Sequence, residues 1–487
     1  MRGARALRAA QRVLYSLAHV PSHGGTRVSK PRGAIVIPSV VLVLVVALSI
    51  FLWSRGDLNR LICDGDCGPA NVVPPRTLTS DTVPAESKPA RPSPGDVDPA
   101  KLTAAVTPAL GASVLGPHVG FSAVSPSSGG ELVSSGAGPY VPASTTKVLT
   151  SFAALSLIDP QTRYSTRVVR SGDQIVLVGG GDPYLTVKGH KKDDPVVRAD
   201  LTTLAGRTAA ALKKSGTTSV SLGFDASLFT GPDASTGWES SYVSQNIVTP
   251  VSALWADQGV QNGMRAKDPA ASAARTFAGL LKDRGITIRR EPEQKNAPGN
   301  ETPIAAVQSA TVARIVDTLI RVSDNQAAEV MLRHLAIAAG KPATFDGGTD
   351  AVVDTLNAAD IDTKGLTLRD GSGLSRRNRI APLTLAQTVR VAASTPRTSG
   401  LVTDLPVSGF TGTLVDRFAK LTSSLGMVRA KTGTLTGVHS LAGYALDAGG
   451  RPVVFAVMAD DTSKVAPLEA QAALDKVAAA IASCECG

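Results

Sequence analysis

The chain has few of the residues that hold metal ions or cross-link small folds. Its 487 residues include only four cysteines and six histidines. The histidines are scattered without the spacing of a ligand set, so we expect no metal cofactor. The cysteines form two close pairs, Cys63/Cys67 and Cys484/Cys486. Each pair could close locally as a disulfide outside the cell, or the pairs could join the two ends of the chain. A zinc site would need all four together and is less favoured.

Acidic residues are absent from residues 1–33, which contain Arg2, Arg5, Arg8, Arg12, Arg27, Lys30 and Arg32. The whole chain has a net charge of +10, from 50 basic and 40 acidic residues, so these seven leave only three excess positive charges elsewhere. Most of the excess positive charge therefore lies in the N-terminal tail, residues 1–33. We do not expect the folded part to bind nucleic acid.

Charged residues are also absent from residues 34–53, a strongly apolar stretch of twenty residues. That length spans a bilayer as a helix of about 30 Å. The basic flank predicts a cytoplasmic tail at 1–33, a single-pass anchor in the cell membrane at 34–53, and everything later outside. A cleaved signal peptide is the alternative, but no small-residue cleavage site follows Trp53. Lipoprotein processing at Cys63 is disfavoured because Arg60 stands where an apolar residue is expected.

The segment 54–99 contains one cysteine pair and then a proline-rich stretch without apolar periodicity. Its eight prolines between Gly68 and Pro99 favour an extended chain. At about 3.1 Å per residue, this stretch could reach up to roughly 100 Å. We therefore expect 54–99 to be an extracytoplasmic linker.

Apolar periodicity in the rest of the chain predicts an α+β fold. Strands are expected at 120–124, 131–135, 427–435, 440–447 and 452–458. Helices are expected near 102–110, over 311–340 with a break at 323–325, and over 467–483. Strands at both ends with helices between them predict an antiparallel sheet closed by both ends of the folded region.

Residues 165–300 show a different pattern, with short strands, turns and one helix at 270–281. The run Gly179–Asp182 looks like a phosphate loop, but it lacks the Gly-Lys-Ser/Thr ending. We interpret it as a turn.

A serine and a lysine lie one helical turn apart after the first two strands. From Pro142 the sequence predicts a helix in which Ser144 and Lys147 are i, i+3 neighbours. A serine hydroxyl is a poor nucleophile until a base removes its proton, and a lysine buried beside it can do so. The first turn of the helix also presents free N–H groups to a developing oxyanion. This is the only Ser-x-x-Lys in the chain.

A second short motif, Ser323-Asp324-Asn325, lies in the predicted break between helices. Its hydroxyl could relay a proton from nucleophile to leaving group, and its amide could hold Lys147. Ser244-Gln245-Asn246 has the same residue types but is followed by an extended segment. We favour Ser323 because a clear helix follows it.

A third motif, Lys431-Thr432-Gly433, occurs once and lies inside a predicted strand. Glycine within a strand often marks close approach of backbone or ligand. The lysine and the threonine hydroxyl could bind a carboxylate, and the N–H of Thr434 could be a second oxyanion donor.

The order Ser-x-x-Lys, Ser-x-Asn, Lys-Thr-Gly is that of penicillin-binding proteins and class A β-lactamases. The chain resembles the serine D,D-peptidases of this superfamily. More narrowly, it resembles the low-molecular-mass class C, peptidase S13-like D-alanyl-D-alanine carboxypeptidases/endopeptidases. The segments that carry the narrower resemblance are Val141–Lys147, Val178–Pro183, Asp370–Ser375 and Arg429–Thr434.

The resemblance implies a penicillin-binding/β-lactamase-like transpeptidase fold. Such a fold has an antiparallel sheet flanked by helices and a helical subdomain. Here an inserted, mostly β region lies between the first and second motifs. Residues 100–164 and 301–487 would form the D,D-peptidase domain, and 165–300 the inserted region.

The resemblance also implies the substrate, a peptidoglycan stem peptide with a D-Ala-D-Ala end or a D-Ala cross-link. Ser144 would attack the D-Ala carbonyl to form an acyl-enzyme, and Ser323 would pass the proton to the leaving amine. Burial and the charge of Lys431 would keep Lys147 neutral.

In the same scheme Asn325 would hold the substrate amide, while Lys431 and Thr432 would bind the terminal carboxylate. N–H groups of Ser144 and Thr434 would polarise the carbonyl. β-Lactams would acylate the same serine and act as covalent inhibitors. The alternatives are a β-lactamase, a non-catalytic cell-wall-binding protein of the same fold, and, more distantly, a cysteine-zinc interaction module.

Overall fold

The computed structural model describes residues 97–189, 196–297 and 302–487. The predicted cytoplasmic tail and membrane anchor, nearly all of the linker, and the pair Cys63/Cys67 lie outside the described residues. Within the described ranges, no helix combines the length and the apolarity needed to cross a bilayer.

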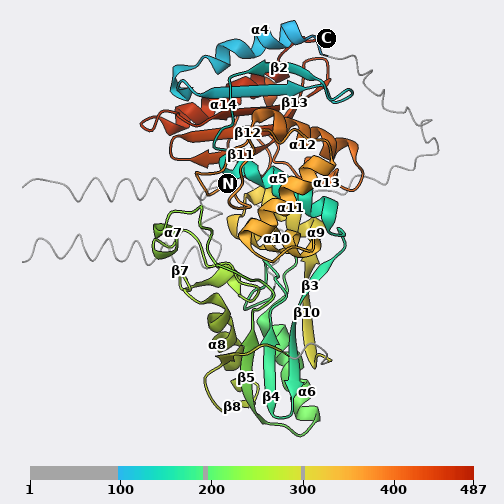
Figure 1. Ribbon diagram of the computed structural model, residues 1–487, viewed down its shortest axis with the longest axis vertical. Helices are drawn as coiled ribbons and strands as arrows, with labels where there is room; N and C mark the ends of the chain where they lie inside the picture. Colours follow the sequence, from blue (N-terminus) through green and yellow to red (C-terminus); the bar gives the residue numbers. More distant parts are fainter. Residues whose placement is uncertain (1–96, 190–195, 298–301) are drawn as a thin grey trace, which may run out of the picture. The chain divides into compact units, whose positions relative to one another are not determined.

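The first and last strands of the folded region share one five-stranded antiparallel sheet, as the sequence predicts (Figure 1). The strand order is β11-β12-β13-β1-β2. The bounds are β1 Val119–Val124, β2 Glu131–Ser135, β11 Val428–Leu435, β12 Val438–Leu446 and β13 Pro452–Ala459. Because β13 pairs with β1, the strand β11 is left at an edge of the sheet.

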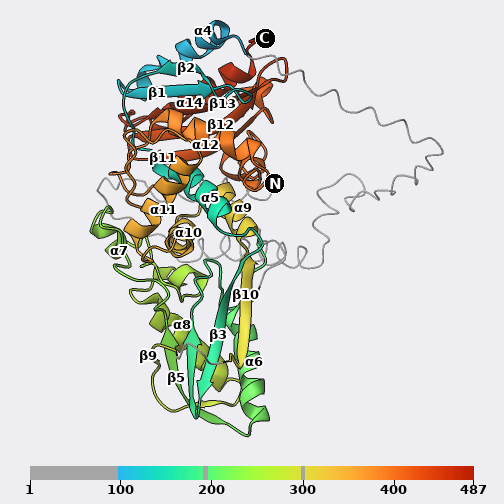
Figure 2. The same ribbon diagram turned by 45° about the vertical axis from the view of Figure 1, so that its right-hand side comes forward.

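Both faces of this sheet are buried, because successive side chains of β13 enter two different cores. Phe455 and Val457 pack with residues of α4 (Pro99–Leu110) and α14 (Pro467–Ala482). Ala456 and Met458 belong to the core shared with the central helices. Figures 1 and 2 show α4 and α14 on one face and α12 on the other. Burial on both faces explains why β13 is apolar along its whole length.

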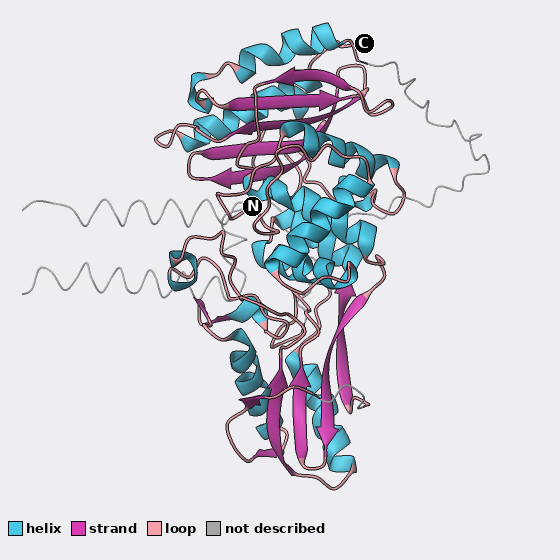
Figure 3. Cartoon of the chain, in the orientation of Figure 1, coloured by secondary structure: helices cyan, strands magenta, loops and turns pink. Residues whose placement is uncertain are grey.

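The central region is helical (Figure 3). Its helices are α5 Thr146–Leu157, α9 Val312–Val322, α10 Asn325–Ala338, α11 Phe345–Ala358, α12 Pro382–Ser394 and α13 Gly400–Thr403. The sequence predicts α9, α10 and the break between them, but not α11 or α12. Every residue of α5 from Thr146 to Leu155 is buried, so the helix that follows Ser144 runs through the core.

A second sheet follows α5 in the chain and has the strand order β10-β3-β4-β5-β8, with β9 also paired to β5. Its strands are β3 Arg163–Ser171, β4 Gln174–Val178, β5 Ser219–Asp225, β8 Thr287–Ile288, β9 Glu293–Gln294 and β10 Ala305–Thr311. This sheet is mixed, since β4 and β5 run parallel whereas β3 is antiparallel to both of its neighbours.

Two long helices, α6 (Leu201–Lys214) and α8 (Pro269–Lys282), share a core with this sheet. The sequence predicts α8 but not α6, so the expectation of one helix in 165–300 is wrong. Threonines in the first turn of α6 lower its helix propensity. Packing of Leu204 and Leu212 into the core overrides that preference. The short elements are η1 Ser113–Leu115, η2 Ala143–Thr145, α7 Ser241–Ser244, η3 Asp257–Gly259, β6 Val260–Gln261, β7 Met264–Arg265, η4 Gly412–Leu414 and η5 Thr422–Ser424.

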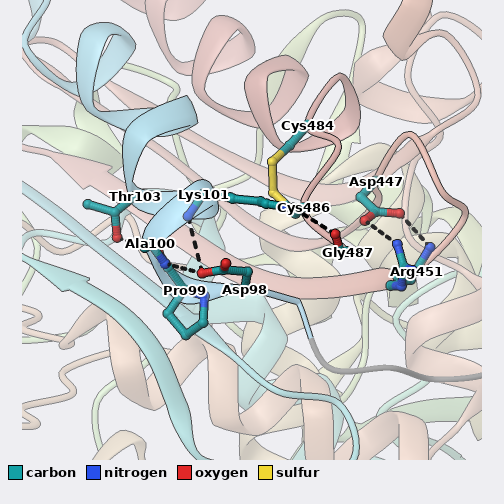
Figure 4. Close-up of a disulfide and its surroundings, with 10 residues drawn as sticks. All are labelled: Asp98, Pro99, Ala100, Lys101, Thr103, Asp447, Arg451, Cys484, Cys486 and Gly487. Carbon is teal, nitrogen blue, oxygen red and sulfur yellow. Dashed lines mark hydrogen bonds and ion pairs between the residues drawn. A yellow bond between two sulfur atoms is a disulfide. The ribbon is translucent and has the colours of Figure 1, made fainter.

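Cys484 and Cys486 form a disulfide after α14 (Figure 4). This pair therefore closes locally. The start of α4 is joined to the end of the chain by hydrogen bonds instead: the N–H of Asp98 donates to the carbonyl of Cys486 at 2.7 Å, and Lys101 Nζ donates to that of Gly487 at 2.8 Å. Sulfurs bonded to each other are not available as zinc ligands.

Candidate active site

Ser144 lies in the short 3-10 turn η2, directly before α5. The sequence predicts an α-helix from residue 142, but the α-helix begins only at Thr146. The reason is the backbone of Ala143, whose φ of +48° cannot continue a right-handed helix. A non-glycine residue in this conformation costs on the order of 1–3 kcal/mol and persists only where its surroundings hold it. The hydroxyl of Thr146 contributes by donating to the carbonyl of Ala143 at 2.9 Å.

Lys147 is fully buried, and its amine contacts the Ser144 hydroxyl as the i, i+3 spacing predicts. The distance from Lys147 Nζ to Ser144 Oγ is 2.9 Å. Two further oxygens lie at 2.7 Å from the same nitrogen, Asn325 Oδ1 and the carbonyl oxygen of Ser372. The first two motifs thus meet at one amine.

Burial lowers the pKa of Lys147 to about 8, although the carboxylates of Glu329, Asp370 and Asp324 favour its charged form. The expectation that burial depresses this pKa is therefore supported. The charge of Lys431, which was expected to lower the pKa of Lys147 as well, does not account for the shift. The repulsion acts on Lys431 itself, whose pKa is lowered well below its usual value by burial and then by the charge of Lys147.

The break between α9 and α10 is a single left-handed residue, Ser323, with φ +59° and ψ 44°. Asp324 then caps α10 by accepting a hydrogen bond from the N–H of Ala327 at 3.0 Å. Because of this tight turn, the side chains of Ser323 and Asn325 contact different lysines. Asn325 accepts from Lys147, whereas Ser323 Oγ accepts from Lys431 Nζ at 2.8 Å.

The competing motif lies elsewhere. Ser244 is exposed on α7, and Asn246 donates to the carbonyl of Gly263 at 3.2 Å. The geometry therefore supports the choice of Ser323 over Ser244.

The third motif, Lys431-Thr432-Gly433, lies on the edge strand β11, and the prediction that it lies inside a strand is correct. Lys431 is fully buried, and besides Ser323 its amine donates to the carbonyl of Thr432 at 2.7 Å. Thr432 Oγ1 donates to Thr413 Oγ1 at 2.9 Å. Thr413, in the turn η4, is a neighbour of the site that no sequence motif indicates.

The direction of the Thr434 N–H follows from the hydrogen bonds earlier in β11. Ser408 N donates to the carbonyl of Val428 at 2.9 Å, and Ala430 N donates to that of Pro406 at 3.0 Å. Both β11 residues therefore direct their backbone groups away from β12. Since this direction alternates along an antiparallel strand, the N–H of Thr434 also points to the free edge. That is the orientation required of an oxyanion donor beside Ser144.

Gly433 brings β11 against the serine turn. A Cβ at this position would lie 2.2 Å from Ser440 Oγ, 2.6 Å from the carbonyl oxygen of Pro142 and 3.1 Å from Ser144 N. The strand can approach the nucleophile this closely only because the residue is glycine.

We predict that Gly433→Ala lowers the rate of acylation by penicillin about 10²-fold, because β11 must shift away from Ser144. The measurement is the rate of labelling by a fluorescent penicillin. Gly279→Ala is the matched control, since a Cβ there meets no atom within 4 Å. Labelling of Gly433→Ala at the rate of the control would show that the close contact is not needed.

Two buried carboxylates near Lys147 belong to no motif that predicts a catalytic role. Asp370 lies in the glycine-rich segment 370–375, and Glu329 lies in none of the motifs. Both are almost entirely inaccessible to solvent. The signal for Glu329 is its spacing, because it follows Asn325 by four residues and so shares a face of α10 with it.

Ser-x-x-Lys at the entry to a buried helix and Lys-Thr-Gly on the edge strand of an antiparallel sheet are motifs of the penicillin-binding serine enzymes. The D-Ala-D-Ala carboxypeptidase 3 (S13) family model matches residues 103–266 and 258–481. The chain therefore belongs to this family, and the resemblance inferred from its motifs is confirmed.

Individual relatives agree with this assignment. A carboxypeptidase of Mycobacterium tuberculosis is 35% identical over 364 residues, which is 72% of this chain and 76% of the relative. The carboxypeptidase DacB of Mycolicibacterium smegmatis is 33% identical over 432 residues, or 83% and 91% of the two chains. Penicillin-binding protein 4 of Haemophilus influenzae has the same fold, with a TM-score of 0.64 over 78% of this chain and 98% of that chain, at 22% identity.

Proposed function

We propose that this chain hydrolyses D-alanyl bonds of peptidoglycan stem peptides through an acyl-enzyme on Ser144. The observation that carries the proposal is the 2.9 Å contact between the Ser144 hydroxyl and the buried amine of Lys147. Membership of the D-Ala-D-Ala carboxypeptidase family indicates the bond that is cleaved. Relatives named as carboxypeptidases support the same activity.

The reaction begins when neutral Lys147 takes the proton of Ser144 and the serine oxygen attacks the D-Ala carbonyl. The N–H groups of Ser144 and Thr434 stabilise the oxyanion, and losing one such donor typically costs about 10²–10³ in rate. Ser323 relays the proton that Lys147 has taken to the departing amine, which returns Lys147 to its neutral form. Lys431, 2.8 Å from Ser323 Oγ, orients that hydroxyl.

The remaining residues hold the substrate. Lys431 and the hydroxyl of Thr432 bind its terminal carboxylate, and the amide of Asn325 binds the peptide. Water then attacks the acyl-enzyme and releases the shortened peptide. A β-lactam acylates Ser144 in the same first step, and the protein is inhibited for as long as the serine remains acylated.

The test is release of D-alanine from diacetyl-Lys-D-Ala-D-Ala, with a purified cross-linked stem-peptide dimer as a second substrate. We expect D-alanine release, and cleavage of the dimer would add endopeptidase activity. Penicillin binding without release from either substrate would favour a non-catalytic wall-binding protein. Rapid hydrolysis of penicillin would favour a β-lactamase.

We also propose that the chain is anchored in the cell membrane by residues 34–53, with the peptidase domain on the outer side. The support is the uncharged apolar run and the basic segment before it. We expect the full chain to sediment with membranes, and a chain that lacks 34–53 to be soluble. Recovery of the full chain in the soluble fraction would contradict the anchor.

A further inference from the structure

Glu329 holds the loop that contacts the catalytic lysine. Its side chain, 1% exposed, accepts hydrogen bonds from two consecutive backbone N–H groups, those of Gly371 and Ser372, both at 2.9 Å. It therefore fixes one side of the loop without contacting Ser144. Two hydrogen bonds to one buried carboxylate constrain both its position and its orientation.

Asp370 holds the same loop from within. Its fully buried carboxylate accepts from the N–H of Gly373 at 3.0 Å and of Ser375 at 2.7 Å, and from Asn378 Nδ2 at 2.7 Å. The fourth donor is the indole N–H of Trp238, at 2.8 Å. Trp238 lies in the region 165–300, so the inserted region contributes directly to this network.

The peptide unit between Ser372 and Gly373 is consequently held at both ends. Its N–H donates to Asp370, and its carbonyl oxygen accepts from Lys147 Nζ at 2.7 Å. The carbonyl cannot turn away from the amine without breaking the bond to the carboxylate on its other side.

The position of this carbonyl decides the direction of the lone pair on Lys147. A neutral amine has two N–H bonds and one lone pair. Two of its three oxygen neighbours, the Ser372 carbonyl and Asn325 Oδ1, can only accept hydrogen bonds. The two N–H bonds are therefore used on them, and the lone pair is left facing the third oxygen, which is the Ser144 hydroxyl.

We propose that Glu329 and Asp370 are positioning residues of the reaction, because together they aim the lone pair of the Lys147 amine at the nucleophile. Without the fixed carbonyl, the amine could rotate and direct an N–H at the serine, which would leave no acceptor for its proton. This inference rests on the proposed function, since it assumes that Lys147 is the base for Ser144.

The test is Glu329→Gln, in which one acceptor oxygen is replaced by an NH2 group that faces a backbone N–H. Stopped-flow reaction with a fluorescent penicillin separates the dissociation constant of the initial complex from the acylation rate constant. Burial raises the pKa of Glu329 to about 8, so the comparison is made at about pH 9, where the side chain is ionised. There we expect the acylation rate constant to fall about 10²-fold, as for a base displaced by about 1 Å, and the dissociation constant to stay unchanged.

The pH profile gives a second readout that lost stability alone would not move. The carboxylates that favour the ammonium form of Lys147 are those of Glu329, Asp370 and Asp324, and the neighbouring amine is Lys431. Removing the first of these carboxylates is expected to move the acid limb of the acylation profile to lower pH.

Asp447→Asn is the matched control. Asp447 is fully buried and accepts from the N–H of Arg451 at 2.7 Å, but it lies at the turn between β12 and β13 (Figure 4). We expect this variant to acylate like the unmodified protein, with the same midpoint. An equal loss in Asp447→Asn, or an unchanged rate and midpoint in Glu329→Gln, would overturn the proposal.

Trp238→Phe provides an independent arm if Glu329→Gln does not fold. Phenylalanine keeps an aromatic ring against Phe345 but removes the N–H that donates to Asp370. A slower acylation step at an unchanged dissociation constant is expected, and an unchanged rate would count against the proposal. Failure of the proposed function is distinguishable, because Ser144→Ala would then label normally whatever Glu329→Gln does.

Discussion

Ser144→Ala is expected to lose all covalent labelling by fluorescent penicillin. Among the described residues of the proposed site, Ser144 is the hydroxyl that contacts the amine of Lys147, and Ser323 contacts Lys431 instead, so no second hydroxyl takes the place of the nucleophile. Loss of the nucleophile in a serine peptidase lowers the rate by roughly 10⁶-fold, and D-alanine release should fall below detection. Labelling is read by gel fluorescence after denaturation, which detects only the covalent adduct.

Ser151→Ala is the matched control on the same buried helix. Its hydroxyl is fully buried and has no hydrogen-bond partner in the described structure, so its removal should change little. We expect this variant to label like the unmodified protein. Persistent labelling of Ser144→Ala would show that another residue is the nucleophile.

The acylation rate is expected to rise with pH up to about 8 and then to level off. Burial lowers the pKa of Lys147 to about 8, and only the neutral amine can take the serine proton. Below that pH the neutral fraction falls about tenfold per pH unit, so at pH 6 acylation should be about 100-fold slower than on the plateau. The measurement is the acylation rate constant between about pH 5.5 and roughly 9.5. An unburied lysine, with its reference pKa of about 10.4, would give no plateau in this range.

Lys147→Met separates this effect from that of Glu329, whose pKa burial also raises to about 8. Methionine fills the space of the lysine stem without a titrating amine. We expect acylation to be almost lost. The acylation rate that remains should not rise with pH, because the variant has no lysine amine to titrate. A rate that is independent of pH from 6 to about 9 in the unmodified protein would contradict the assignment of Lys147 as the base.

Much of the fold could be predicted because the sequence signals are local. Strand-like runs bounded by turn residues predict β1, β2 and the three C-terminal strands within a few residues of their observed bounds. Helical periodicity likewise predicts α8, α9, α10 and α14. The sequence does not predict the helices α6, α11 and α12, because their threonines and the glycines of α6 and α11 lower the local helix propensity, and tertiary burial stabilises them.

The same division applies to the site. The spacing of Ser144 and Lys147 implies contact, since three residues on a helix bring two side chains together. Contacts between segments far apart in the sequence could not be predicted in this way. That Asn325 shares the amine of Lys147 with the Ser372 carbonyl requires α10 and a later loop to meet, and no local pattern contains that information.

By itself, the sequence determined which chemical groups are present: one Ser-x-x-Lys, a Ser-x-Asn in a helix break, and a Lys-Thr-Gly in a strand. Only the tertiary structure decided which lysine each group contacts and how strongly each amine is desolvated. The physical reason is that a pKa and a lone-pair direction depend on neighbours brought together from several elements, whereas helix and strand periodicity depend on residues a few positions apart.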